Sequence, residues 1–406
     1  MDLGAERIIR RLNEAGYEAY AVGGCVRDAL MGSEPHDWDI TTSAVPETVK
    51  RLFSHTFDTG IEHGTVTVLS SGAAYEVTTF RIDGVYTDHR RPDSVTFAGS
   101  LYEDVARRDF TINAMAYHPD KGLIDYFDGQ GDLKRKLIRC VGDPMKRFDE
   151  DALRMLRAVR FSAKLGFSID PATWEAIVRL SDTIADVSKE RILDEVTKTL
   201  VSDHPERLLL AETSGLAGEF CEEFKEKGVL EFEKLGLVRA SRELRFAMLM
   251  RHMVPERAGA ALRELKADNA LRKGTVRLLE HIHDPLPKDE VSMRRLMHDA
   301  GRDLIPDLLD LRLAAEVDTE AGSKEAHALF ASQKDMPVTL ADLAVSGRDV
   351  IAQGVTPGKD VGECLEYLLN EVIKDPEKNT SDQLKQESKR WKTRKETLIL
   401  PKTAEN

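Results

Sequence analysis

The sequence predicts an α+β chain that begins with a sheet-containing domain and continues as helices. Runs of β-branched and aromatic residues, separated by short helical stretches, fill roughly the first 140 residues. After about residue 145, apolar residues recur three and four positions apart, which is the helical period. The chain has 406 residues, 41% of them hydrophobic. This is enough for about two to four domains and excludes a disordered or fibrous chain.

The N-terminal part is expected to mix helices and strands. Its first 16 residues are charged and amphipathic, which predicts a helix. Pro46 suits the first turn of another helix, where its missing N–H is not needed. Two short helices are expected at 26–31 and 46–53, and strands at 17–22, 38–41, 65–69 and 74–80.

Helices account for the remainder. The clearest pattern runs from 149 to 165, where apolar positions form one continuous side. The other predicted helices are 174–180, 189–200, 206–211, 229–252, 256–281, 292–315, 325–332, 339–353 and 360–372.

Charge and cysteine usage exclude several classes of protein. The formal net charge is −13, which argues against an indiscriminate nucleic-acid coat. No run of about 18 apolar residues occurs, so no membrane span is expected. The four cysteines are far apart without a CxxC pair, which argues against a zinc ribbon or disulfide framework and favours a reducing cytoplasm. They are Cys25, Cys140, Cys221 and Cys364.

A glycine pair follows the first predicted strand. Gly23 and Gly24 let the backbone approach a ligand and expose its N–H groups, and Arg27 lies in the first turns of the next helix. The positive end of that helix and the arginine could hold a triphosphate. A glycine pair by itself is more often an ordinary turn.

Two aspartates flank Trp38 on a predicted strand. Asp37 and Asp39 are two residues apart, so they share a strand face and repel each other unless a cation lies between them. Mg²⁺ prefers such oxygen ligands and leaves positions open for phosphate and water. Glu76 lies in an otherwise apolar strand and could complete a two-metal site. A solvated strand face is the alternative, and the order GG, Arg, DxD favours the metal site.

Polar residues also crowd the segment 107–114. Arg108 could neutralise phosphate charge, and Asp109 and Asn113, one helical turn apart, could hold a ribose hydroxyl. A capped helix start with internal ion pairs explains the same residues equally well.

A row of charged residues follows on the predicted helix 149–165. Asp151, Arg154, Arg157 and Arg160 recur every third residue, so neighbouring members touch. Asp151 and Arg154 can present an acceptor beside a donor. This matches the pairing edges of cytosine and adenine and mismatches those of uracil and guanine. Arg157 and Arg160 would be left for stacking or phosphates. A solvated face with ion pairs is the alternative.

These segments together resemble the bacterial class II tRNA nucleotidyltransferases, the CCA-adding enzymes of the polymerase-β-like superfamily. The motifs that carry the resemblance are VGGCVRD, DWDI, YEVTTF, RRDFTIN and EDALRMLRAVRF. The segments KERILDE and AVSGRDV resemble the later neck motif and part of the tail. Motif cover is strong between about residues 17 and 200 and weaker beyond.

The resemblance implies an architecture and a reaction. A mixed-sheet, polymerase-β-like head (1–145) would be followed by an all-helical neck that recognises the base (146–205), a body (206–288) and a tail that binds tRNA (289–406). C, C and A would be added to the tRNA 3′ end from CTP and ATP, with release of pyrophosphate and without a nucleic-acid template.

The resemblance also assigns roles to the residues above. Mg²⁺ would be bound by Asp37 and Asp39, with Glu76 as third carboxylate. Gly24, Arg27 and Arg108 would contact the triphosphate and sugar, with Asp109 close by. Asp151 and Arg154 would select the nucleotide, and Arg157 and Arg160 would line the same pocket.

Three alternatives remain open from the sequence. A bacterial poly(A) polymerase shares the motifs, and a catalytically idle RNA-binding protein could use the same fold. A CC-adding enzyme is disfavoured by the polar segment 83–92, since the resembled family needs a loop there for the final A.

Two basic segments, 131–164 and 385–402, could bind RNA, because each carries a local net charge of +5. Trp391 in the second segment could stack on a base or belong to a core. A homodimer is also open.

Overall fold

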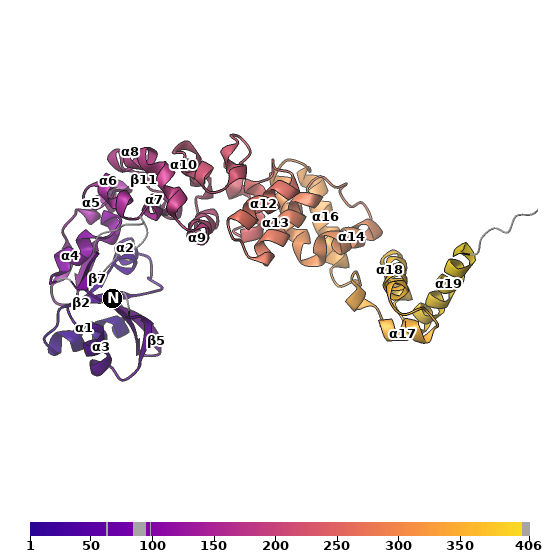
Figure 1. The fold of residues 1–406 in the computed structure, drawn as a ribbon, viewed down its shortest axis with the longest axis horizontal. Coiled ribbons are helices and arrows are strands. Elements are labelled where there is room, and N and C mark those ends of the chain that lie inside the picture. The colour runs from indigo at the N-terminus through magenta and orange to yellow at the C-terminus, as the bar shows by residue number, and fades with distance from the viewer. Residues whose placement is uncertain (62–63, 84–94, 98, 400–406) are drawn as a thin grey trace, which may run out of the picture. The chain divides into compact units, whose positions relative to one another are not determined.

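The computed structural model describes residues 1–61, 64–83, 95–97 and 99–399 (Figure 1). Nearly all of the polar segment 83–92 lies outside these residues. The described chain forms two compact units. The first contains Met1–Gly236, Ala240–Arg242 and Ala260–Asp268; the second contains Leu237–Arg239, Glu243–Gly259 and the described residues from Asn269 onward.

A mixed sheet is the centre of the first unit, as predicted. Within the described residues it has seven strands, in the order β3-β4-β5-β2-β1-β8-β9. All neighbouring strands are antiparallel except β2 and β5. The strands are β1 (Ala19–Val22), β2 (Asp39–Thr42), β3 (Thr56–Gly60), β4 (Thr65–Ser70), β5 (Ala73–Thr79), β8 (Met115–His118) and β9 (Gly122–Asp125).

Helices cover both faces of this sheet. On one face α1 (Leu3–Glu14) and α3 (Pro46–Leu52) share a buried cluster with side chains of β2, β4 and β5. On the other face α4 (Leu101–Ala106) packs on Tyr20 and Val22. Strand β5 alternates, so Tyr75 and Val77 enter the α1 cluster while Glu76 stays exposed. The period of the strand therefore decides on which face the carboxylate of Glu76 appears.

Helices after the sheet complete the first unit. They include α5 (Gly129–Arg135), α6 (Pro144–Glu150), α7 (Leu153–Leu165), α8 (Pro171–Leu180), α9 (Lys189–Leu200) and α10 (Leu209–Thr213). The prediction of one helix over 149–165 is wrong at its start. Asp151 has an extended backbone (φ −147°, ψ 101°) and its side chain accepts from the N–H of Leu153 at 3.2 Å. The extended backbone at Asp151 ends α6, and its carboxylate helps to begin α7.

The second unit is helical, as predicted, but its helices are shorter. The predicted helix 229–252 is wrong in its first half: α11 begins only at Arg242, after turns in which the Glu231 side chain accepts two backbone N–H groups. The predicted helices 256–281 and 292–315 are each interrupted, at Lys266 (φ 62°) and Gly301 (φ 95°). The long helices of this unit are α13 (Asn269–His281), α15 (Ile305–Ala314), α16 (Glu320–Gln333), α18 (Lys359–Lys374) and α19 (Ser381–Ile399).

No helix in the described ranges has both the length and the apolar character needed to cross a membrane.

The predicted helix 339–353 is divided into a 3₁₀ turn and α17 (Gly347–Ala352), because Ser346 begins α17 with a capping box. The basic segment 385–402, for which no helix was predicted, is largely α19.

Candidate active site

Two carboxylates meet where β2 and β5 run parallel. Asp39 opens β2, and its Cα partner across the pair is Glu76. Register partners share a face, so these side chains are neighbours on the sheet surface. Asp37 lies in the loop before β2 rather than on the strand, and both Asp37 and Asp39 are exposed. The parallel pairing brings together two carboxylates that are far apart in the sequence.

The pKa values of Asp39 and Glu76 are both raised from their ordinary values. Loss of solvent and the charge of Asp37 raise the pKa of Asp39, against the opposing charge of Arg108. Loss of solvent and the charges of Asp39 and Asp37 likewise raise the pKa of Glu76. The three carboxylates therefore repel one another in this structure, and a bound cation would relieve that repulsion.

Arg108 lies directly against the glycine turn. Gly23 has φ 81° and caps α2 (Gly24–Leu30), and a Cβ there would come within 2.9 Å of Nη1 of Arg108. Only glycine combines this conformation with so close a contact. The Arg108 guanidinium also lies 3.5 Å from the buried Asp104. Its Nε is buried and has no hydrogen-bond partner within the described residues.

Arg27 is buried and already well bonded. Its Nη1 donates to Oδ1 of Asn113 at 2.6 Å, and its Nε donates to Oδ1 of Asp28 at 2.8 Å. Only 3% of the residue is exposed. Arg27 and Asn113 are therefore one hydrogen-bonded pair behind Gly24, and the structure does not place a free Arg27 guanidinium on the surface.

Asp109 is a buried anchor for the arginine row. One carboxylate oxygen accepts from Nε and Nη2 of Arg157, at 2.9 and 2.6 Å. The other accepts from the backbone N–H of Phe110 at 2.8 Å and from the Asn113 amide at 3.2 Å. Burial by itself would raise the pKa of Asp109, but the charge and hydrogen bonds of Arg157 outweigh it and lower the value to about 2. The sequence left two interpretations of Asp109 open, an internal ion pair and a contact with a ligand. The structure shows the ion pair, and a ligand contact would have to form beside it.

Asp151 and Arg154 lie at the start of α7, each with partners of its own. Asp151 accepts from Nη2 of Arg191 at 3.0 Å. Arg154 donates to Oε2 of Glu150 at 2.8 Å and to the backbone carbonyls of Arg147 and Arg107. The two side chains predicted to read a base are therefore both present at one helix end and both held in position.

Two residues of α9 complete this region. Arg191 holds Asp151, and Glu195, which is 3% exposed, lies 2.5 Å from Arg160 and 3.7 Å from Arg157. Sequence reasoning gave these two residues no individual role. Their four-residue spacing on one helix, opposite arginines that recur every third residue on another, is the signal that could have found them.

Within the described ranges, no group of three or more His, Cys, Asp or Glu side chains is arranged so that it could hold a metal ion. Asp37, Asp39 and Glu76 are three exposed carboxylates, of which only Asp39 and Glu76 are register partners. Such a set fits a hard divalent ion whose coordination is completed by phosphate and water.

Comparisons with known protein families match three parts of the chain. A model described as "Poly A polymerase head domain" matches residues 19–139, and one described as "Probable RNA and SrmB-binding site of polymerase A" matches 166–227. A third, "tRNA nucleotidyltransferase domain 2 putative", matches 240–387. The head motifs and KERILDE fall in matched regions, whereas EDALRMLRAVRF lies between the first and the second of them.

Individual proteins are similar over nearly the whole chain. A CCA-adding enzyme of Limosilactobacillus fermentum is 39% identical over 374 residues, which is 91% of this chain and 92% of that protein. The crystal structure of the Bacillus stearothermophilus CCA-adding enzyme in complex with CTP is 35% identical, with a TM-score of 0.82 over 98% of this chain and 100% of that one. A tRNA nucleotidyltransferase complexed with a primer tRNA and an incoming ATP analog is 25% identical, with a TM-score of 0.64 over 80% of this chain and 99% of that one.

Proposed function

Since this chain belongs to the family of CCA-adding enzymes, we propose that it adds C, C and A to the 3′ end of tRNA from CTP and ATP and releases pyrophosphate. The observation that carries the proposal is the parallel pairing of β2 with β5, which sets Glu76 beside Asp39 on an exposed face. Arg108, whose charge acts on Asp39, supplies a cation next to the carboxylates. Nucleotidyl transfer needs both, because charge develops on the phosphate oxygens during the reaction.

Nucleotidyltransferases of this family use a divalent metal ion, and we propose that here it is Mg²⁺, held by Asp37 and Asp39 with Glu76 as third carboxylate. When bound, such an ion lowers the pKa of the attacking 3′-hydroxyl and binds the triphosphate. The chain's own part is to keep the carboxylates aligned. The rigid β2–β5 register does this for Asp39 and Glu76.

The phosphates are proposed to lie against Gly23, Gly24 and Arg108. The missing Cβ of Gly23 leaves room for the Arg108 guanidinium beside the turn, and this guanidinium supplies positive charge for phosphate oxygens. Arg27, held by Asn113, would contribute charge from behind the turn. Asp109 and Asn113 remain the proposed contacts of the ribose.

The base is proposed to be read by Asp151 and Arg154. A pairing edge that offers both a donor and an acceptor, as in cytosine and adenine, satisfies both side chains. Uracil or guanine would mismatch both side chains, and each base polar group left without a partner costs about 1–3 kcal/mol. The bonds to Arg191 and Glu150 support this role, because they hold both side chains at the helix end before the nucleotide arrives.

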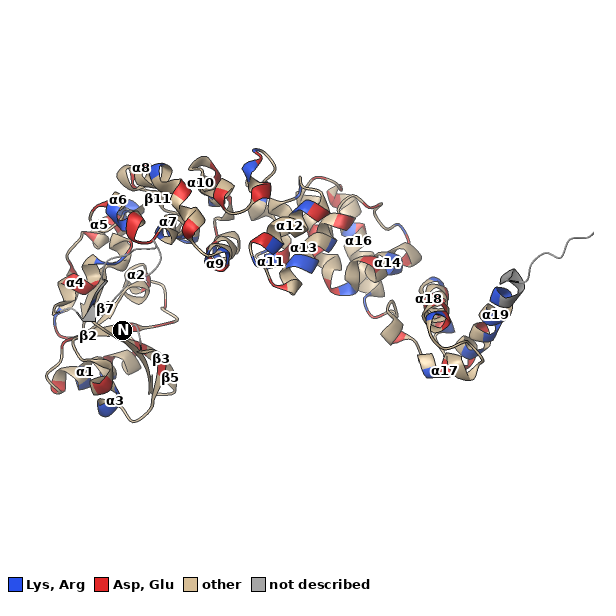
Figure 2. Cartoon of the chain, viewed as in Figure 1, with Lys and Arg blue, Asp and Glu red and all other residues tan. Residues whose placement is uncertain are grey.

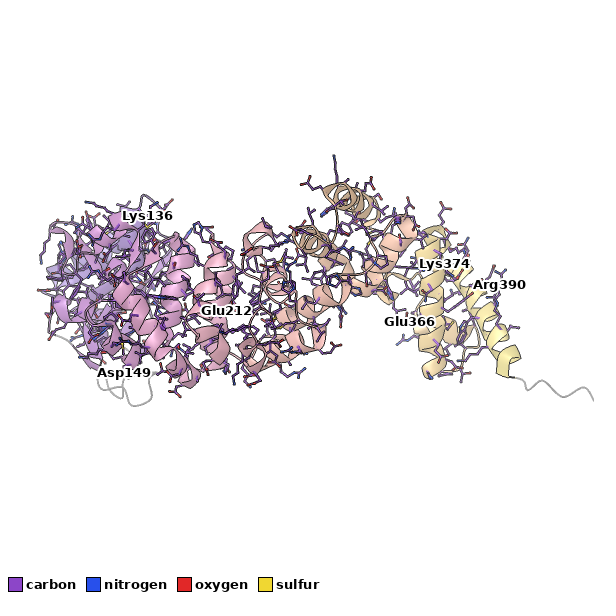
Figure 3. The ribbon with its side chains drawn as sticks, turned by 90° about the horizontal axis from the view of Figure 1, so that it is seen from above. Lys136, Asp149, Glu212, Glu366, Lys374 and Arg390 are labelled. Carbon is purple, nitrogen blue, oxygen red and sulfur yellow. The ribbon has the colours of Figure 1, made fainter. Side chains whose placement is uncertain are left out.

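Binding of tRNA is proposed to use the tail and exposed lysines at the end of the head and in the neck. Within 131–164, Arg154, Arg157 and Arg160 are taken up by the site, and Lys134, Lys136, Lys146 and Lys164 are exposed. Lysine and arginine side chains also occur along the length of α19 (Figure 2). Arg390 and Lys389 are exposed there (Figure 3 labels Arg390), whereas Trp391 packs against the buried cluster of the tail, which supports its reading as a core residue.

Replacing Lys389 and Arg390 by glutamine should weaken tRNA binding and reduce the slope of log affinity against log salt by about two, with the KM for CTP unchanged. An unchanged slope would exclude this surface. A titration at saturating concentration also gives the number of protein chains bound per tRNA, which is one for a monomer and two for a homodimer. Four buried free thiols support a reducing compartment such as the cytoplasm.

The division into head (1–145), neck (146–205), body (206–288) and tail (289–406) is part of the proposal. The end of the first matched model at residue 139 supports the boundary of the head, whereas the other two models, 166–227 and 240–387, cross the proposed neck–body and body–tail boundaries. Two of the three models carry the name of poly(A) polymerase, which makes that activity the alternative to exclude.

A single incubation tests the function. A tRNA that lacks its terminal CCA is incubated with Mg²⁺ and CTP, ATP or both, and product length is read at nucleotide resolution. Two nucleotides with CTP and three with both are expected. A long A tail would indicate a poly(A) polymerase. A product that stops after two nucleotides would indicate a CC-adding enzyme, and the absence of any product would indicate an inactive protein. Asp39→Asn should abolish addition, whereas Asp58→Asn, an exposed carboxylate of the same sheet that pairs with Lys50, should not.

A further inference from the structure

The ring of Phe161 is surrounded by guanidinium groups. Phe161 lies on α7 and is 5% exposed. The Cζ atoms of Arg160, Arg27 and Arg157 lie 4.2, 5.4 and 5.5 Å from the ring centroid. Phe110 packs against the same ring in an edge-to-face contact, with centroids 5.7 Å apart. All three arginine contacts are within the range of cation–π attraction.

Each of these arginines also has a polar partner that a nucleotide would compete with. Arg157 is bonded to Asp109, Arg160 to Glu195, and Arg27 to Asp28 and Asn113. A carboxylate holds a guanidinium but cancels its charge toward a phosphate. An aromatic ring holds the cation through its quadrupole and leaves the net positive charge intact.

We propose that Phe161 is a positioning residue for nucleotide binding, whose ring keeps the guanidinium groups of Arg157 and Arg160 in place while they exchange protein partners for the incoming CTP or ATP, and holds the buried Arg27 behind them. This inference rests on the proposed function, because it takes these arginines to line the nucleotide site. It gives Phe161 a role beyond packing, since a leucine would fill much of the same space without attracting the cations.

Stepwise fluorination of the ring tests the role. Fluorine withdraws charge from the π face while the shape of the ring hardly changes, so each added fluorine weakens cation attraction. Mono-, di- and trifluorophenylalanine are placed at position 161, and KM and kcat for CTP and ATP are measured with truncated tRNA. We expect log KM to rise steadily along the series, by roughly 5- to 30-fold in total, with little change in kcat.

Phe110 provides the matched control. It forms the same ring pair but has none of the three cation contacts, so fluorination at position 110 perturbs packing without touching the arginines. The melting temperature should shift in both series, and KM only in the series at 161. Equal KM values along the 161 series, or equal slopes at 161 and 110, would show that Phe161 is only a core residue.

Ordinary substitutions give a second measurement. Phe161→Leu should raise KM by about tenfold. Phe148→Leu, at a fully buried phenylalanine of α6, should lower the melting temperature without that rise. Calorimetric titration with CTP keeps the test independent of turnover. If the wild-type protein fails to extend tRNA, the proposed function is wrong. If it extends tRNA but its affinity for CTP does not change on fluorination of Phe161, only the role of Phe161 is overturned.

Discussion

The buried contact between Asp109 and Arg157 should make a measurable contribution to the stability of the first unit. Asp109 is 8% exposed, and one of its oxygens accepts two hydrogen bonds from Arg157. Asp109→Asn keeps the size of the side chain and removes its charge. Arg157 then retains Glu195, at 3.7 Å, as a more distant carboxylate. The substitution therefore tests one charge pair in an otherwise unchanged site.

The magnitude follows from the pKa of Asp109, which is lowered from 3.8 to about 2. A difference of one unit is 1.36 kcal/mol, so the folded state gains about 2–3 kcal/mol from ionised Asp109. Because the folded pKa lies below the unfolded value, this contribution is complete above about pH 4 and is lost as the pH falls through about 2. Asp109→Asn should therefore destabilise the unit by about 2–3 kcal/mol, equally at about pH 7 and pH 5.5.

Urea unfolding followed by tryptophan fluorescence measures this loss. Of the three tryptophans, Trp38 and Trp174 belong to the first unit and Trp391 to the second. In a Trp391→Phe background the signal therefore reports on the first unit alone. Asp128→Asn is the matched control, since Asp128 pairs with Arg135 on the surface and asparagine suits its left-handed backbone. A loss below about 1 kcal/mol, or one that changes between the two pH values, would refute the reasoning.

Three further outcomes are expected. Asp39→Asn should raise the melting temperature of the metal-free protein at neutral pH, because a carboxylate with a raised pKa destabilises the fold when ionised. It should also remove the increase in melting temperature that Mg²⁺ gives the wild-type protein, and lower turnover at least about 1000-fold. Arg154→Ala should relax base selection, increasing incorporation of UTP and GTP relative to CTP and ATP by roughly 10- to 100-fold in competition assays; continued exclusion of both would rule out base reading by Arg154. Arg312→Met should destabilise the second unit by about 3–5 kcal/mol, since it leaves the buried Asp318 without its guanidinium; Trp391 fluorescence reports it, and a loss under about 1 kcal/mol would show that the pair contributes little.

Several elements were predictable because their signals are local. Strand β4, strand β5 and helix α9 lie within a residue or two of the predicted ranges, since each has an uninterrupted period and polar residues at its ends. Strands β8 and β9 were missed because short strands in a sheet need partners far along the chain before their pattern means anything. Helix α19 was missed because its charged residues masked the few apolar positions, such as Leu384, that pack on the tail cluster.

The break at Asp151 shows the same limit at the site. The apolar period continues across it, so periodicity predicts one helix. The backbone turns there because the Asp151 side chain accepts from the N–H of Leu153 and bonds to Arg191, a residue of another helix. A local pattern carries no information about that second helix.

The sequence by itself determined which chemical groups this protein has and their order along the chain: the glycine pair, the carboxylates, the arginine row and the succession of sheet and helices. Spacing within one strand or helix is a property of the backbone and can be read without tertiary contacts. Only the tertiary structure decided that Glu76 lies beside Asp39, that Asp109 anchors Arg157, and that three arginines share the ring of Phe161. These contacts join residues distant in sequence, and they exist because strand register and helix packing bury both partners together.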